Sequence, residues 1–387
     1  MNKSMRSMLL RAGAIRRRFR RAGRQTSLGV DVGQFETKLV WLEKKKQTFD
    51  VAFAKFETFT QSQSNQSRER MPEERRQSGC NPFKSKLVKD PSQSTLWDSK
   101  RLREVAFRIV NTLGEPNAIK SNVVLNLSME ACDIRGLCLS EQDQGAKALQ
   151  LALREACGGN ESYSIARLPN LQTDTAKVRV FSIPHSLTNS IVAALEQENL
   201  KPRRIDGLPW CMQRLTSSLP EVGRDTVLPI LDWSFGNPML CLATPKEVKY
   251  VRRLKSGGLS ELLSHAQREL ELNPAGGNRW LQRCFQEAQL IDGETGELPS
   301  LAKAICQQIR SEIRAALDFA SWHLRGDIID KIMVVGGGAA LPGLIEYLQR
   351  EMGAEVIPWS RKIGDTQLTP EYAIASSLAM LGASDAS

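Results

Sequence analysis

The sequence predicts an α/β protein of two lobes, and three observations support that prediction. The chain has 387 residues, whereas a single hydrophobic core stops growing near roughly 250–300 residues. A strand-like apolar run ends in an Asp-containing turn twice, in LGVDVG at 28–33 and in VLPILDWSFG at 227–236. Each turn opens a set of strand-like segments, and helices with further strands follow each set. We therefore expect a weak internal duplication, with a cleft between two related halves.

The first half opens with alternating apolar and polar residues over 28–57, which predict three antiparallel strands with the charged turn KKKQ before the third. Residues 60–98 are rich in Ser, Gln and charge, and they predict a long loop or a disordered insertion. The later predicted elements are a helix at 99–113, a strand at 123–128, a small αβ unit at 131–183 (a helix at about 141–156 and strands near 162–168 and 176–183), a helix at about 186–199, and a strand followed by a helix to about 218.

The second half repeats this plan. MLCLAT and VKYVRRL continue the strands that start at 227, and GGLSELLSHAQREL predicts a helix after a pair of glycines. Residues 273–298 are polar and predict an irregular segment. The remaining predictions are a helix at about 300–324, the strand KIMVV, the glycine triplet 336–338 and a helix at about 342–352. The expected domain limits are 1–26 for a basic tail, 27–217 for the first lobe and 218–387 for the second lobe.

The composition is that of an ordinary globular protein, with 41% hydrophobic and 25% charged residues. No stretch approaches the roughly 18–20 uninterrupted apolar residues that span a bilayer, so a membrane role would be peripheral. The eight cysteines form no CxxC pair, and the chain has only three histidines. This disfavours a zinc site, because zinc ligands usually come in close pairs. Reduced thiols in a cytoplasm are the simplest interpretation.

The N-terminal tail carries most of the net charge of +10, because nine basic residues lie in 1–24 and no acid precedes Asp31. Apolar residues recur every three to four positions from Met5 to Phe19, and on a helix they share one face. Such a helix over residues 3–24 predicts contact with an anionic membrane surface. The alternatives are a disordered basic arm or sequence without a role. Nucleic-acid contact is disfavoured, because aromatic residues and a basic folded face are missing.

Five blocks carry a resemblance to a known family. In chain order they are GVDVGQFETKLVWLE at 29–43, VVLNLS at 123–128, LDWSFG at 231–236, VVGGGAALPGL at 334–344 and LTPEYAIASSLAML at 368–381. Their order resembles the actin-like ATPase superfamily, and within it the chain looks most like PilM, the cytoplasmic assembly protein of type IV pili. The unit at 131–183 resembles the small subdomain shared by PilM and the division protein FtsA. The resemblance implies a two-lobed actin-like ATPase fold with an FtsA/PilM-type inserted small αβ subdomain.

The resemblance also implies ATP and Mg²⁺ in the cleft between the lobes. The two Asp turns would aim backbone N–H groups at the phosphates, and Asp31 and Asp232 would hold Mg²⁺ indirectly, through water. The glycine triplet would lie beside the adenosine, since bare backbone allows close approach. The implied cofactor-binding residues are Asp31, Gly33, Lys38, Asp232, Gly236, Gly257, Gly258, Glu312, Gly336, Gly337 and Gly338.

Several of these residues also fit a purely structural role. Lys38 fits a solvated strand lysine, and the Gly257-Gly258 pair fits the start of a helix as well as a cleft loop. Glu312 faces the nucleotide only in one register of its helix. The catalytic residue is left open. Asp206 is a candidate, because a carboxylate in the connecting strand could orient water, but it also fits the cap of a turn.

The two phosphate turns depart from the PilM pattern. The second turn usually resembles Asp-Ile-Gly-x-x-Thr-Thr, but residues 232–238 are DWSFGNP. Ser234 replaces a glycine where phosphate must come close, and Pro238 lacks an N–H donor. In the first turn, QFE at 34–36 stands where small serines are expected. We therefore expect a weakened ATP site, with weak or absent ATPase activity.

The resemblance implies a cytoplasmic adaptor at the inner face of the inner membrane, in a type IV pilus or a related type II secretion platform. Such an adaptor holds the cytoplasmic N-terminal peptide of a PilN-like single-pass membrane protein, here near residues 131–183, by backbone pairing and side-chain pockets. Self-association is left open. The alternatives are a membrane-tethered, filament-forming protein like FtsA or, less favoured, a small-molecule kinase on the same lobes.

Overall fold

The structure is a computed structural model. It describes residues 26–34, 36–45, 48–57, 97–113, 122–139, 145–169, 177–219, 222–255, 257–287, 300–324, 328, 330–341 and 343–384. The predicted tail at 1–26 and the predicted loop at 60–98 lie outside the described residues, except for Thr26 and residues 97–98.

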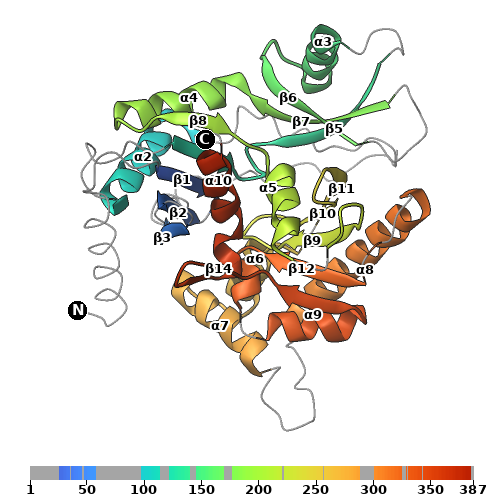
Figure 1. Cartoon of the computed structure of the whole chain (residues 1–387). Coiled ribbons are helices and arrows are strands. Elements are labelled where there is room, and N and C mark those ends of the chain that lie inside the picture. The colour runs from blue at the N-terminus through green and yellow to red at the C-terminus, as the bar shows by residue number, and fades with distance from the viewer. Residues whose placement is uncertain are drawn as a thin grey trace, which may run out of the picture.

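The described elements form an upper lobe, a lower lobe and a smaller unit beside the upper lobe (Figure 1). The strands are β1 (Thr26–Val32), β2 (Glu36–Lys45), β3 (Thr48–Glu57), β4 (Asn122–Leu127), β5 (Asp133–Cys138), β6 (Tyr163–Leu168), β7 (Lys177–Pro184), β8 (Pro202–Ile205), β9 (Leu228–Asp232), β10 (Met239–Ala243), β11 (Val248–Arg253), β12 (Lys331–Val335), β13 (Glu355–Pro358), β14 (Arg361–Ile363) and β15 (Thr366–Leu368). The helices are α2 (Ser99–Leu113), α3 (Ala146–Cys157), α4 (His185–Gln197), α5 (Leu208–Leu215), α6 (Leu259–Glu269), α7 (Pro274–Glu287), α8 (Ser300–His323), α9 (Leu344–Met352) and α10 (Ala373–Ser384), with the 3-10 turns η6 (Thr216–Ser218), η7 (Gly337–Ala340) and η8 (Pro370–Tyr372). None of the described helices combines the length and the apolarity needed to cross a membrane.

Both lobes are built around a five-stranded sheet with the same strand plan. The first sheet has the order β3-β2-β1-β4-β8, and the second has the order β11-β10-β9-β12-β13. In each sheet three strands form an antiparallel meander, and two further strands continue parallel to the first strand of that meander. This duplicated plan confirms the predicted two-lobed α/β fold class.

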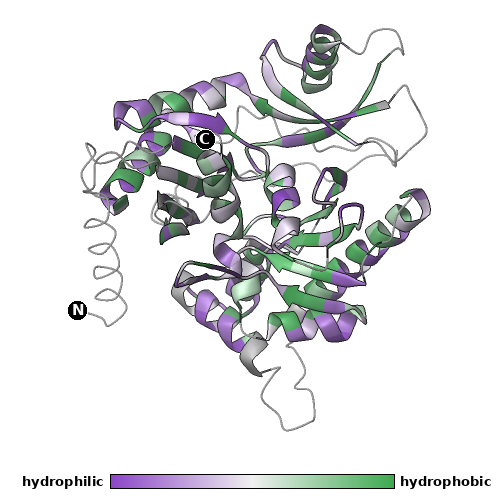
Figure 2. Cartoon of the chain, in the orientation of Figure 1, coloured by the Kyte–Doolittle hydropathy of each residue, from purple (hydrophilic) through white to green (hydrophobic). Residues whose placement is uncertain are grey.

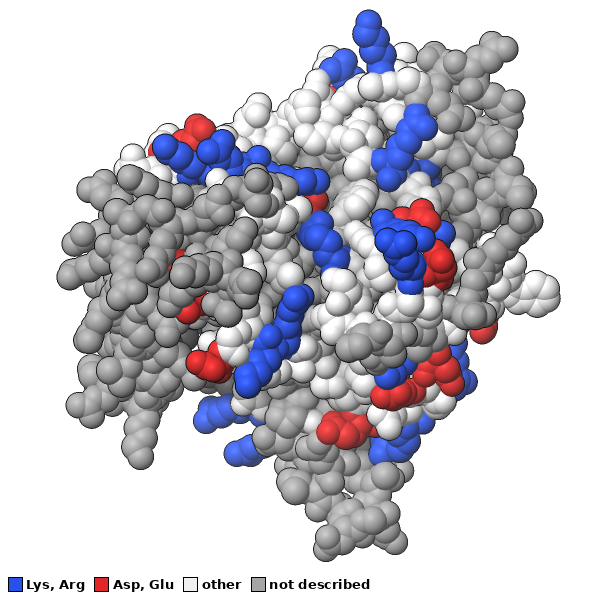
Figure 3. All heavy atoms as spheres, in the orientation of Figure 1, with Lys and Arg blue, Asp and Glu red and all other residues white. Residues whose placement is uncertain are grey.

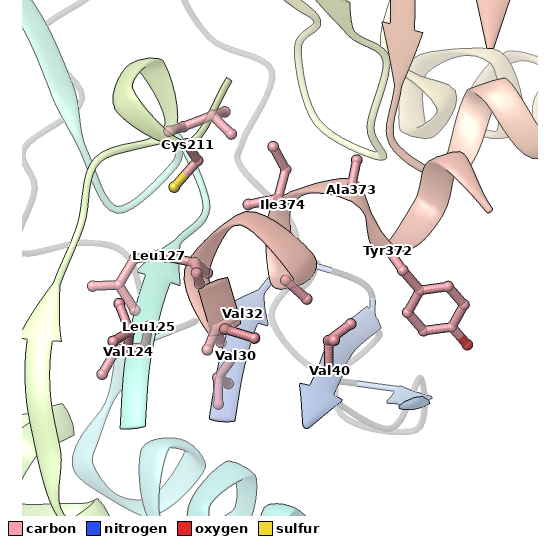
Figure 4. Packing of buried hydrophobic residues seen from close by; sticks show 14 of the residues in the cluster. Val30, Val32, Val40, Val124, Leu125, Leu127, Cys211, Tyr372, Ala373 and Ile374 are labelled. Atoms are coloured by element: carbon pink, nitrogen blue, oxygen red, sulfur yellow. The ribbon is translucent and has the colours of Figure 1, made fainter. Parts of the chain in front are cut away.

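One hydrophobic core joins the lobes, because α5 and α10 lie between the two sheets and bury apolar residues of both. Figure 4 shows the start of α10, with Ala373 and Ile374, over the apolar residues of β1 and β4. The helix packs mainly on β1, β4 and β2, so it completes the first lobe, whereas the predicted limit at 217/218 places it by sequence with the second. Gly29 permits this packing, since a Cβ there would overlap the Ala375 carbonyl.

A second core fills the far face of the second sheet under α6, α7, α8 and α9, and Figure 2 shows mixed apolar and polar faces along these helices. The expectation of an irregular segment at 273–298 is wrong for its first part, where α7 forms. Asn273 caps this helix, because its Oδ1 accepts the Gly276 N–H at 2.8 Å. Leu281 and Cys284 are buried. The glycines of the first turn conceal the pattern, since glycine disfavours helix interiors.

A small unit is inserted in the chain between β4 and β8. Its sheet has the order β5-β7-β6 with antiparallel pairing, and it shares a small core of its own with α3. The unit also touches the second lobe, because Arg179 of β7 donates to the Val251 carbonyl at 2.7 Å and its guanidinium lies over the Tyr250 ring. It is therefore braced against β11 of the second lobe.

Candidate functional site

A cleft of about 370 Å³ opens between the two lobes. Its walls come from β1, β2, β3 and the turn after β4 on the first lobe, and from the turn after β9, α6, α7 and η7 on the second. Both predicted Asp turns line it, with Asp31 and Gly33 on one side and Asp232 and Gly236 on the other. The cleft thus has an Asp-turn end and a helical end.

Four polar side chains form a row across the first sheet where it meets the cleft. The strand registers place one of them on each of β3, β2, β1 and β4, namely Lys55, Lys38, Asp31 and Asn126. Such cross-strand partners project to the same face of a sheet, and all four line the cleft. Lys38 is only 7% exposed, which disfavours the alternative of a solvated strand lysine. Burial raises the pKa of Asp31, while the charge of Lys38 and a 3.1 Å hydrogen bond from Asn126 oppose that rise.

Asp232 ends β9 and lies near other carboxylates. Its Oδ1 accepts the Ser234 hydroxyl at 2.6 Å. Burial, together with the charges of Asp31 and Glu130, raises the pKa of Asp232 to about 7, although the Ser234 hydrogen bond and the charge of Lys38 lower it. Near neutral pH this carboxyl is therefore partly protonated, and a protonated carboxyl is a poor partner for Mg²⁺.

The glycine triplet faces the cleft only in part. Gly337 lines it. Gly336 has a φ of 90°, and a Cβ there would fall 2.5 Å from Asp232 Oδ1. Gly338 donates its N–H to the Trp233 carbonyl at 2.8 Å. Two of the three glycines thus let the chain after β12 pack against the second Asp turn, and the third leaves room for a ligand.

Three other predicted site residues, Gly257, Gly258 and Glu312, do not line the cleft. The Gly257 carbonyl accepts an indole N–H from the second Asp turn at 2.9 Å. A Cβ at Gly258 would overlap the Gly236 carbonyl. Glu312 accepts a backbone N–H from the loop after β11 at 3.0 Å. The two glycines therefore pack against the second Asp turn, and Glu312 holds the loop after β11.

Asp206 follows β8 and forms an ion pair with Arg214 of α5. Its carboxylate also lies 3.9 Å from Arg204 and accepts the Cys211 thiol at 3.8 Å. Arg214 in turn donates to the Ser377 hydroxyl of α10 at 3.1 Å. Asp206 does not line the cleft, and its ion pair instead joins the end of β8 to α5, which Arg214 links on to α10.

The helical end of the cleft combines apolar and amide side chains. Its lining residues from α6 and α7 are Leu259, Leu263, Asn278, Leu281 and Gln282. These walls suit a flat ring with hydrogen-bonding edges, such as a purine. The sequence patterns do not predict the α7 residues, because no helix is expected there. The available signal was Asn273 before a proline, which is typical of a helix start.

The Asp-turn end is acidic. Among the residues that line the cleft, the carboxylates are Asp31, Glu36, Glu130, Asp232 and Glu371, and the lysines are Lys38 and Lys55. Lys55 lies 3.6 Å from Glu36 and 3.4 Å from Glu371, so its charge is already balanced. A nucleoside triphosphate would therefore meet net negative charge at this end.

The residues present therefore fit the two parts of a nucleotide unequally. The helical end fits an adenosine, whereas the Asp-turn end offers too many carboxylates for phosphates. Within the described part of the chain, no group of three or more His, Cys, Asp and Glu side chains is placed to hold a metal ion. If Mg²⁺ binds, Asp31 and Asp232 are the residues that would hold it, with water completing its coordination.

The paired sheets and the cleft define an actin-like ATPase fold. The chain is similar to a chain of the PilM–PilN type IV pilus biogenesis complex, with a TM-score of 0.61 and 17% identity over 92% of this chain and 98% of that chain. The fold is thus of the PilM type, as predicted. Less similar are the ethanolamine utilization protein EutJ from Carboxydothermus hydrogenoformans (TM-score 0.47, 12% identity, 92% and 89% covered) and the activator of the 2-hydroxyisocaproyl-CoA dehydratase from Clostridium difficile with bound ADPNP (TM-score 0.42, 11% identity, 94% and 96% covered). The sequence matches no protein-family model and no curated protein.

Proposed function

We propose that this chain is an actin-like adaptor of an inner-membrane assembly platform, in a type IV pilus or a related type II secretion system. Its partner is the cytoplasmic N-terminal peptide of a PilN-like single-pass membrane protein. The observation that carries the proposal is the inserted three-stranded sheet, which has an open edge, in a fold of the PilM type.

Strand β5 is an outer strand of that sheet, and among the described residues no strand pairs with its other side. Leu137 is the one buried residue of the strand. Gly136 is exposed, and a side chain there would meet open space. An extended peptide can add to such an edge through backbone hydrogen bonds, while its alternate side chains enter pockets.

The cleft supports an adaptor more than an enzyme. We propose that ATP with Mg²⁺ binds weakly there and that hydrolysis is not the role of the chain. The acidic Asp-turn end disfavours phosphates. The small-molecule kinase alternative needs an available catalytic carboxylate in the first lobe, and Asp206 is engaged by Arg214.

We also propose that residues 3–24 contact the inner face of the inner membrane. On the face shown in Figure 3, the described lysines and arginines are spread among acidic residues over both lobes, whereas residues 1–24 hold basic residues and no acid. Co-sedimentation with vesicles tests this contact. Binding to anionic but not to neutral vesicles is expected, and it should weaken when Arg16, Arg17 and Arg18 are replaced by Gln. Equal binding by the variant would contradict it.

The adaptor proposal is tested with a synthetic peptide from the N-terminus of a PilN-like single-pass membrane protein of the same organism. We expect the full chain to bind it in a fluorescence anisotropy titration. Two versions of the peptide are N-methylated at alternate backbone positions, one set in each register. Loss of several hydrogen bonds should weaken one register by about tenfold or more and leave the other nearly unchanged. No binding of the unmodified peptide would overturn the adaptor role, and equal effects of both registers would overturn edge pairing.

A further inference from the structure

The turn after β4 carries Glu130 from the first lobe to the second Asp turn. It is closed by a hydrogen bond from the Ala131 N–H to the Ser128 carbonyl at 2.9 Å. It is also tied to β1, because the Ser128 N–H donates to the Val32 carbonyl at 2.9 Å. The backbone of this turn is therefore a fixed part of the first lobe.

Arg253 of β11 holds the same turn from the second lobe. Its Nη1 donates to the Met129 carbonyl at 3.2 Å, and its Nη2 lies 3.7 Å from Glu130 Oε1. The Glu130 side chain is 20% exposed and that of Arg253 is 36% exposed, so water partly screens this pairing. The turn and its carboxylate thus connect the lobes across the cleft.

The carboxylate of Glu130 lies directly on Gly236. The three atoms nearest to a Cβ built at Gly236 all belong to the Glu130 side chain, and Oε1 would overlap it. The charge of Glu130 also helps to raise the pKa of Asp232 in the same turn. The bare backbone that a phosphate oxygen would approach is therefore already covered by a carboxylate.

We propose that Glu130 is an internal substitute for a nucleotide phosphate, which occupies the second Asp turn, bridges the lobes and excludes the phosphates of a nucleoside triphosphate. This goes beyond the adaptor role and stands whether or not a peptide binds β5. A carboxylate and a phosphate on the same turn repel each other unless a cation lies between them. A triphosphate must therefore displace Glu130. Without that displacement, the cleft admits a nucleoside that carries no phosphate, held at its helical end.

Calorimetric titration of the full chain with Mg-ATP, and separately with adenosine, tests this inference on the wild type, Glu130→Ala and Glu371→Ala. Glu371 lines the same cleft, and its removal leaves Lys55 paired with Glu36. It therefore controls for the loss of one negative charge. Glu130→Ala should bind Mg-ATP at least about tenfold more tightly than the wild type, and Glu371→Ala should gain less than about threefold. Adenosine affinity should be the same in all three proteins.

An equal gain for both variants would indicate general electrostatics and overturn the proposal. It would also be overturned if Glu130→Ala bound adenosine as the wild type does but gained nothing for Mg-ATP, or if it bound neither ligand. Glu130→Gln, which keeps the size of the side chain and removes its charge, takes its place if the alanine variant does not fold. Peptide titration of the same samples reports separately on the adaptor role.

Hydrogen exchange of residues 233–237 tests the bridge between the lobes without relying on affinity. Without nucleotide, we expect these backbone amides to exchange faster in Glu130→Ala than in the wild type, because their covering carboxylate is gone. Mg-ATP should restore their protection in the variant. Unchanged exchange in Glu130→Ala would show that Glu130 does not bridge the lobes.

Discussion

The two ends of the cleft differ in chemistry although one fold builds both. At the helical end, leucines and amides of α6 and α7 line the cleft. At the Asp-turn end, carboxylates outnumber lysines, and Glu130 covers Gly236. Gly336 and Gly338 pack against the second Asp turn. These glycines are therefore required by the fold whatever the ligand, so the architecture of a nucleotide site can persist after its phosphate chemistry weakens.

The largest effect should distinguish a glycine that the packing requires from one that leaves room for a ligand. Gly336→Ala places a Cβ at positive φ and against Asp232 and Ser234, which should lower the free energy of unfolding by about 4 kcal/mol. A Cβ at Gly337 meets open space, so Gly337→Ala should change it by less than about 1 kcal/mol. Urea unfolding measures both variants. Similar losses would remove the distinction between the two positions.

The raised pKa of Asp232, at the Asp-turn end, should make the stability of the chain depend on pH. The pKa of Asp232 is about 7 in the folded chain and near 3.8 without the fold, so the folded state binds more protons between these values. Stability should therefore fall as pH rises from about 4 to about 7. Asp232→Asn removes this contribution. It should match the wild type near pH 4 and exceed it by about 4 kcal/mol at pH 8, in urea unfolding with chelator present. If the stability of the two proteins changed with pH in parallel, the pKa of Asp232 would not be raised in the folded chain.

Single deletions of amide side chains test whether the helical end binds adenosine. Asn278→Ala or Gln282→Ala should weaken adenosine binding by about fivefold, the worth of one hydrogen bond, and leave stability nearly unchanged. Arg279 lies on the same helix but does not line the cleft, so Arg279→Ala should bind adenosine like the wild type. Calorimetry distinguishes the three variants. If all three bind adenosine equally, the purine does not lie against α7.

The smallest effect concerns Gly236. The three atoms nearest to a Cβ there all belong to the flexible side chain of Glu130, so Gly236→Ala should cost less than about 1 kcal/mol, because the carboxylate can turn aside. In a Glu130→Ala background the cost should vanish, and a double-mutant cycle measures that coupling. A loss in both backgrounds as large as that of Gly336→Ala would mean that the backbone, and not Glu130, requires the glycine.

The parts of the fold that sequence predicts are those with strong local periodicity. Helix α2 spans Ser99–Leu113 as its apolar spacing predicts, and the repeated Asp turns predict the two lobes. The parts that the sequence does not reveal depend on contacts between distant positions. Nothing near α10 in the sequence indicates that it returns to β1, and nothing near Glu130 indicates Gly236. The position of Lys55 in the cleft follows from the hairpin register, which sets it opposite Lys38. The sequence alone does not fix that register.

The most direct test of the difference between the two ends is a pair of titrations on the wild-type chain, one with adenosine and one with Mg-ATP at the same pH and ionic strength. If the helical end is retained and the Asp-turn end is blocked, Mg-ATP should bind no more tightly than adenosine. Mg-ATP binding at least about tenfold tighter than adenosine, lost on Asp31→Ala, would show that the phosphates are held and would contradict the difference between the two ends.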